Sequence, residues 1–234
     1  MEIQPIDHSL LLKIFTDPSV IKKMVELNGC LTHEAAFGVQ YHLLQDKYHV
    51  TSVADGEVES VELDWEEELP KGWPSLPLVH YHTHVKDSLL MPTGWNGDVA
   101  GANEMRVYDW KRNGLDFRAL HGITRHQSAH APWEMLLYQE SSPNLLPREE
   151  MKSRTRRLFE GSFYEEAEQA DVVDAMRATG VYHCELLTLY RRRDGTRFFP
   201  EEELRKLQAF TFDARVVDEG RFKKNYLANT HNTP

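Results

Sequence analysis

The chain has 234 residues, of which 41% are hydrophobic and 27% are charged, as in a soluble globular protein with a substantial core. Its formal net charge of −10 argues against a general nucleic-acid binder, because phosphate contacts require clustered cations. It has no apolar run of membrane-spanning length, no signal-peptide pattern and only two cysteines, so we expect a cytoplasmic protein without a membrane partner.

Two helices and two strands are predicted in the first part of the chain, at residues 10–16, 18–27, 34–44 and 48–53. Ser9 is a suitable cap for the first helix, and Pro18 fits the first turn of the second. The acidic stretch 57–68 and the residues up to 77 predict a loop or short insertion. Its carboxylates either face solvent or meet a basic partner surface.

In the second part we expect a helix, two strands, a long helix and a hairpin, at residues 98–111, 115–124, 133–138, 148–179 and 182–199. Asn96 is a suitable cap for the first of these helices. The serine and proline residues of 141–147 are the clearest boundary signal in the chain. We therefore expect one domain at 1–140 and an α+β extension at 141–234.

Three histidines alternate along one predicted strand. Residues 76–84 alternate apolar and polar side chains closely enough to indicate a buried strand. Side chains two positions apart project from the same face, so His80, His82 and His84 would lie on one side of a sheet. Since buried imidazoles need partners, the row is either a set of ordinary half-buried polar positions or a ligand site.

His82 and His84, together with Asp98 at the start of the next predicted helix, favour the ligand site. Two imidazoles and a carboxylate suit tetrahedral zinc with a fourth position left for water, and such an open position is typical of catalytic zinc. Iron, cobalt and manganese accept the same donors and stay open as alternatives. His80 lies a step further back on the strand and is predicted to be a core or supporting residue.

A hydrolytic metal site also needs a general base that is not itself a ligand, and Glu34 is the candidate. It begins a predicted strand of small and apolar residues, where an unpaired carboxylate would be costly. The alternative is that Glu34 is a surface residue at a strand end, which is the commoner fate of a glutamate.

Three motifs in this order resemble the JAMM motif of the MPN metalloprotease family: Glu34-Ala-Ala-Phe-Gly-Val, Leu78-Val-His-Tyr-His-Thr-His84 and Pro92-Thr-Gly-Trp-Asn-Gly-Asp98. The resemblance covers residues 6 to 139. It implies an α/β (α+β) fold with an MPN/cytidine-deaminase-like core, in which helices flank a mixed curved sheet. Residues 1–140 would form this core, and residues 141–234 would form a helix-hairpin-helix extension that packs on it.

The resemblance also implies roles for individual residues. His82, His84 and Asp98 would bind Zn²⁺, and Glu34 would activate the attacking water and then protonate the leaving amine. The family's oxyanion-binding serine is replaced by Trp95 in strict register, and thirteen residues separate His84 from Asp98 in a loop longer than is usual in the family. Thr93 is the expected catalytic substitute for this serine, with Ser88 as the alternative.

The function implied is a zinc-dependent metalloprotease or isopeptidase that cleaves after the C-terminal tail of a ubiquitin or ubiquitin-like modifier. The substrate partner would be a ubiquitin-like protein or its conjugate, and the acidic stretch 57–68 occupies the place of a substrate-binding insertion in related enzymes. A non-catalytic MPN scaffold and a small-molecule amide or thiocarboxylate hydrolase are the alternatives. The extension would gate the site, bind a partner protein or form a homodimer.

Overall fold

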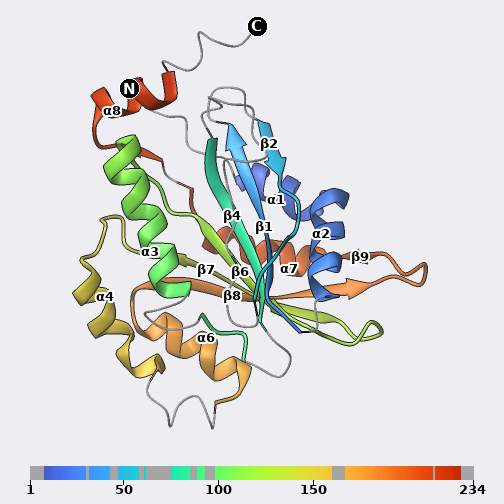
Figure 1. Ribbon diagram of the computed structural model, residues 1–234. Coiled ribbons are helices and arrows are strands. Elements are labelled where there is room, and N and C mark those ends of the chain that lie inside the picture. Colours follow the sequence, from blue (N-terminus) through green and yellow to red (C-terminus); the bar gives the residue numbers. More distant parts are fainter. Residues whose placement is uncertain are drawn as a thin grey trace, which may run out of the picture.

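The structure is a computed structural model that describes residues 8–29, 32–42, 47–57, 61, 75–84, 89–92, 98–159, 167–212 and 214–227. Within these residues the chain forms a curled mixed sheet with helices on both faces (Figure 1). This confirms the predicted α+β class, with a mixed curved sheet flanked by helices.

The main sheet has eight strands in the order β2-β1-β4-β6-β7-β8-β9, with β3 also paired to β1. The strands are β1 (Ala35–His42), β2 (Lys47–Val50), β3 (Ala54–Asp55), β4 (Ser75–His84), β6 (Leu120–Arg125), β7 (Trp133–Glu140), β8 (Tyr182–Arg191) and β9 (Arg197–Phe198). β4 and β6 run parallel, whereas the other neighbours run antiparallel. Parallel neighbours need a crossover connection, and here it contains helix α3 (Asp98–Tyr108).

The other helices are α1 (His8–Thr16), α2 (Pro18–Asn28), α4 (Arg148–Thr155), α6 (Gln169–Ala178), α7 (Glu201–Lys206) and α8 (Glu219–Phe222). Short π or 3₁₀ turns follow several of them: η1 (Asp109–Asn113), η2 (Arg156–Phe159), η3 (Leu207–Ala209) and η4 (Lys223–Leu227). A second, two-stranded sheet pairs β5 (Leu115–Asp116) with β10 (Arg215–Val216). None of the described helices is long and apolar enough to cross a membrane.

Each face of the main sheet packs against its own hydrophobic cluster. On one face α1 buries Phe15 against Tyr81 of β4, with ring centroids 6.1 Å apart. On the other face Met151 of α4 and Met176 of α6 pack together, and Figure 1 shows these two helices on the same side as α3. Because side chains alternate along a strand, the neighbour of Tyr81, His82, faces this second side.

The predicted extension supplies strands to the same sheet. β7 pairs with β8 along the whole length of β7, from Trp133 opposite Leu189 to Glu140 opposite Tyr182. Buried residues of β8 and η3 also belong to the same hydrophobic cluster as α1. The boundary at residue 140 stays a prediction, but the segments on its two sides share one sheet and one core.

The prediction of a single long helix at residues 148–179 is wrong. α4 ends at Thr155, and α6 begins only at Gln169, after Glu168 in an extended conformation (φ −84°, ψ 164°). A straight helix over the predicted range would be about 48 Å long and would run past the sheet. Two shorter helices instead bury Met151 and Met176 in one cluster, so tertiary burial overrides helix propensity here.

The prediction of one strand at residues 115–124 is also wrong, because this segment forms two strands, β5 and β6. The residues between them include Arg118, whose guanidinium turns inward and donates to the carbonyl oxygens of Glu140 (3.2 Å) and Ser141 (3.0 Å). β5 joins the small sheet while β6 joins the main sheet, so a buried arginine marks the point where the chain changes sheets.

Arg106 fastens α3 to the sheet through a buried ion network. Its side chain is 3% exposed, and it donates from Nε to Asp116 (2.7 Å) and from Nη1 to Glu140 (2.5 Å). Burial alone would lower the pKa of Arg106, but the hydrogen bonds and charges of Asp116 and Glu140 raise it above its ordinary value. Removing one partner of such a network costs about 3–5 kcal/mol, because a charge is left buried without compensation.

Gly122 of β6 allows the ring of Tyr81 to lie flat on the sheet. A Cβ at Gly122 would lie 2.3 Å from Cδ1 of Tyr81. We therefore expect Gly122→Ala to lower the free energy of unfolding by about 1–3 kcal/mol, measured by urea denaturation. Gly101 of α3, where a Cβ would meet nothing within 4 Å, is the control: Gly101→Ala should stabilise by about 0.5–1 kcal/mol. Equal effects at the two positions would contradict this packing.

Asp109, at the start of the π turn after α3, is a buried carboxyl with one hydrogen bond, from Asn113 (2.8 Å). Burial raises the pKa of Asp109 to about 6, even though the bond from Asn113 acts to lower it. The folded state therefore holds this proton more tightly than the unfolded state does. Stability is lost as the pH rises from about 4 to about 6, and the whole penalty is present above that range.

We expect Asp109→Asn to raise the free energy of unfolding by about 2–3 kcal/mol at pH 8 and to change it little at pH 4. The exposed Asp174 of α6 is the control, since Asp174→Asn should have the same small effect at both pH values. Urea denaturation at the two pH values is the measurement. A pH-independent effect at Asp109 would show that its carboxyl is ionised without penalty in the folded protein.

Candidate metal centre

The end of β4 and the start of α3 bring three predicted ligands together. Nε2 of His82 lies 3.1 Å from Nε2 of His84, and the Asp98 carboxylate lies 3.1 Å from His82 and 3.2 Å from His84. The two histidines are 2% and 4% exposed and Asp98 is 17% exposed. All three side chains therefore converge on one small, nearly buried volume.

The spacing of these donor atoms fits a metal ion. A tetrahedral zinc site with bonds of about 2.0–2.1 Å has donor atoms about 3.3–3.4 Å apart, close to the three distances found here. Two imidazole nitrogens only 3.1 Å apart also need a proton or a cation between them. The His82, His84 and Asp98 group can therefore bind a metal ion, and the three donors leave one tetrahedral position open.

Local sequence explains this convergence. The alternation of β4 places His82 and His84 on one face at the strand end, and the crossover brings the first turn of α3 over that end. Asp98 stands in the first helical turn, where the helix dipole stabilises a negative charge. Burial would raise the pKa of Asp98, but the two histidines hold it well below its ordinary value, so the carboxylate is ionised.

The charge of the group also affects His82. Burial disfavours the charged ring, but the Asp98 carboxylate and the more distant Glu34 together raise the pKa of His82 above its ordinary value. A proton on His82 and a metal ion compete for the same nitrogen. Metal binding at this group should therefore release protons and weaken as the pH falls.

The structure places Glu34 near His82, His84 and Asp98, which are called the metal group below. In the pairing of β1 with β4, Ala36 lies opposite His82, so the alternation of side chains puts Glu34, two residues earlier, on the same face as Ala36. Glu34 thus belongs to the histidine face, and it is 9% exposed, not a surface residue. Its backbone is fixed by bonds to Glu57 and Gly56, both of 2.8 Å. Its catalytic role stays a prediction.

Small residues of β1 leave room for the imidazoles. Ala36 and Gly38 lie directly opposite His82 and His80, on the same face of the sheet. Neither has a side chain beyond Cβ, so β1 and β4 can pair closely while the rings stand over the sheet. This is the physical reason for the run of small residues after Glu34.

Thr83 was not predicted as a site residue, yet it links the two halves of the site. Its side chain is buried, and Oγ1 accepts a hydrogen bond of 2.9 Å from the backbone N–H of Ala35. This bond fixes the chain immediately after Glu34 to the residue between His82 and His84. A hydroxyl residue at position 83, where the alternation of the strand calls for an apolar side chain, is the signal that could have identified it.

His80 and His121 continue the row of rings away from the metal group. His80 stacks on His82 with centroids 5.4 Å apart and meets His121 edge to face at 5.8 Å. Burial lowers the pKa of His80 well below its ordinary value and that of His121 to about 4, so both are neutral. The three-residue group found among the described residues does not include His80, whose supporting role stays a prediction.

Several predicted features lie outside the described residues. These are Thr93 and Ser88, the two candidates for the oxyanion-binding residue, and Trp95 in the serine position. Of the acidic stretch 57–68, only Glu57 and Val61 are described.

No family model, no curated protein and no solved structure matches the chain. The fold and the site together define a class: a mixed α+β protein with a buried His–His–Asp group that can bind a metal ion.

The bond from Ala35 to Thr83 can be tested with two variants. Thr83→Val keeps the shape of the side chain but leaves the Ala35 N–H buried without an acceptor, so we expect a loss of about 1–3 kcal/mol and faster exchange of this amide. Thr83→Ser keeps the acceptor and should leave the Ala35 amide protected. Urea denaturation and amide hydrogen exchange are the measurements. Unchanged protection of Ala35 in Thr83→Val would refute this link.

Proposed function

We propose that the chain is a zinc-dependent peptidase or isopeptidase of the JAMM type, cleaving after the C-terminal tail of a ubiquitin or ubiquitin-like modifier. The observation that carries this proposal is the position of Glu34, a buried carboxylate two residues before the partner of His82 and close enough for its charge to raise the pKa of that histidine. A buried carboxylate beside, but outside, a three-donor metal group is the arrangement that metal-assisted hydrolysis needs.

His82, His84 and Asp98 would hold the ion. Two imidazoles and one carboxylate with an open fourth position favour zinc in a catalytic setting. When bound, zinc supplies a Lewis acid that polarises a carbonyl group and makes water a better nucleophile at neutral pH.

Glu34 would move the proton. Its carboxylate would accept a proton from the attacking water and donate it to the nitrogen of the leaving amine, acting first as base and then as acid. The bond between Ala35 and Thr83 supports this role, because it fixes the backbone next to Glu34 relative to both histidines. The nearly buried site would strengthen electrostatic interactions by excluding bulk water.

The order of elements supports an MPN-like core. A helix (α2) precedes the strand that follows Glu34 (β1), a hairpin strand (β2) comes next, and the histidine strand (β4) is followed by the Asp98 helix (α3) and strands β6 and β7. This is the order that the resemblance to the MPN domain implies. The ubiquitin-like substrate rests on the same resemblance, and an extended tail would bind by adding to a sheet edge beside the metal.

The metal and the base can be tested separately. The purified chain should contain one equivalent of zinc by elemental analysis and should lose cleavage of ubiquitin-like fusions when a chelator is added. We expect His82→Ala to lose the zinc, and Glu34→Gln to keep the zinc but lose at least about 10²-fold in activity. His130→Ala and Glu134→Gln, at more exposed positions, are the matched controls and should change neither property.

Each alternative has its own outcome. A chain without stoichiometric zinc and without activity would be the non-catalytic scaffold. Zinc-dependent hydrolysis of small amides or thiocarboxylates, with no cleavage of any ubiquitin-like fusion, would establish the small-molecule hydrolase. Full activity in Glu34→Gln would contradict the proposed mechanism.

A further inference from the structure

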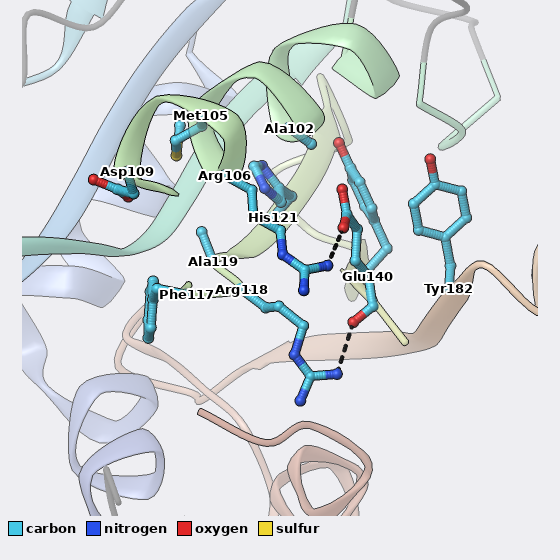
Figure 2. Close-up of a pocket in the computed structure, with 11 residues that line it drawn as sticks. Ala102, Met105, Arg106, Asp109, Phe117, Arg118, Ala119, His121, Glu140 and Tyr182 are labelled. Carbon is cyan, nitrogen blue, oxygen red and sulfur yellow. Dashed lines mark hydrogen bonds and ion pairs between the residues drawn. The ribbon is translucent and has the colours of Figure 1, made fainter. Parts of the chain in front are cut away.

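A small polar cavity lies between α3 and the sheet, and none of the three metal donors lines it. Its volume is about 10 Å³, and residues of α3, β6, β7 and β8 line it. Figure 2 shows Arg106, His121, Glu140 and Tyr182 around this space, with Arg106 bonded to the Glu140 carboxylate. Ala102, which also lines it, is one helical turn after Asp98.

Three buried polar atoms in residues that line the cavity have no hydrogen-bond partner within the described part of the chain. They are Oη of Tyr138, Oη of Tyr182 and Oε1 of Glu140. The three residues are 1%, 3% and 6% exposed, so bulk water does not satisfy them. Leaving buried hydroxyl and carboxylate groups unpaired is costly, and three such atoms in residues that line one cavity favour a ligand inside it.

Both phenols stay protonated. Burial raises the pKa of Tyr138 and of Tyr182, and the negative charges of Glu140 and Asp98 add to the rise for Tyr182. Each hydroxyl is therefore able to donate one hydrogen bond and to accept another, whereas Oε1 of Glu140 only accepts.

The charges around the cavity are already balanced. Arg106 pairs with Asp116 and Glu140, and the guanidinium of Arg118 lies against the backbone oxygen of Glu140. Asp109 is a further carboxyl on the wall and Arg215 also pairs with Asp116, so three guanidinium groups balance three carboxyl groups and no excess negative charge favours a metal ion or an ammonium group. The ligand must donate to a carboxylate and also accept from a phenol, which a neutral molecule with O–H groups can do.

We propose that this cavity is an internal hydration site for a single water molecule, bound by Tyr138, Tyr182 and Glu140. A cavity of this volume has room for about one water, and three partners is the usual number for a buried one. The water donates to Oε1 of Glu140 and exchanges hydrogen bonds with the two phenols. The water links β7 to β8 beneath α3. It therefore helps to hold the helix that carries Asp98.

Whether removal of a tyrosine hydroxyl raises or lowers the melting temperature tests the proposal. If the water is present, Tyr138→Phe and Tyr182→Phe each remove one of its bonds, and the melting temperature should fall by about 2–4 °C. If the hydroxyls are unpaired, the same variants should melt higher, because a buried unsatisfied group has been removed. Tyr190→Phe, on β8 but outside the cavity, is the control and should change the melting temperature little.

A double variant and a direct observation complete the test. Tyr138→Phe with Tyr182→Phe should lower the melting temperature by less than the two single losses together, because both phenols bind the same water. A high-resolution crystal structure of the wild-type chain should show one density peak within hydrogen-bond distance of the three oxygens. Higher melting in either single variant, or phenols bonded directly to Glu140 with no water between them, would overturn the proposal.

Discussion

The register of β1 against β4 is the constraint on which the site depends. Ala36 opposite His82 places Glu34 and both histidines on one face, and a slip of one residue would send Glu34 to the opposite face. The register is fixed by hydrophobic packing on the other face, where Phe37 stacks on Tyr81 with centroids 4.9 Å apart. The geometry of a polar site is thus set by an aromatic pair on the far side of the sheet.

Asp98, the third residue of the group that can bind a metal ion, is positioned by different means. Asp98 is carried by α3, which is fixed to the sheet at its far end by Arg106 and its two carboxylate partners. Between Asp98 and Arg106 the helix passes over the small polar cavity. The metal donors therefore have two supports, a strand pairing for the histidines and a buried ion network for the aspartate, and the two can be perturbed independently.

The parts of the site that sequence predicts are those set by local pattern. Alternation along β4 and the first turn of a helix at Asp98 need only neighbouring residues, so the ligand group was predictable. The helix break before Gln169 and the inward turn of Arg118 were not, because both depend on burial against distant segments. The role of Arg106 was equally hard to predict, because its partner Glu140 is 34 residues away and an arginine in a helix is usually exposed.

The pairing of β7 with β8 bears on how the chain can be divided. β7 is a central strand, buried on both faces along most of its length, and all of its residues face partners in β8. Ending the chain at residue 140 would convert it into an uncovered apolar edge, open to pairing with other molecules. Glu34, His82, His84 and Asp98 all lie before this point in sequence, yet a protein that ended there would be prone to aggregate.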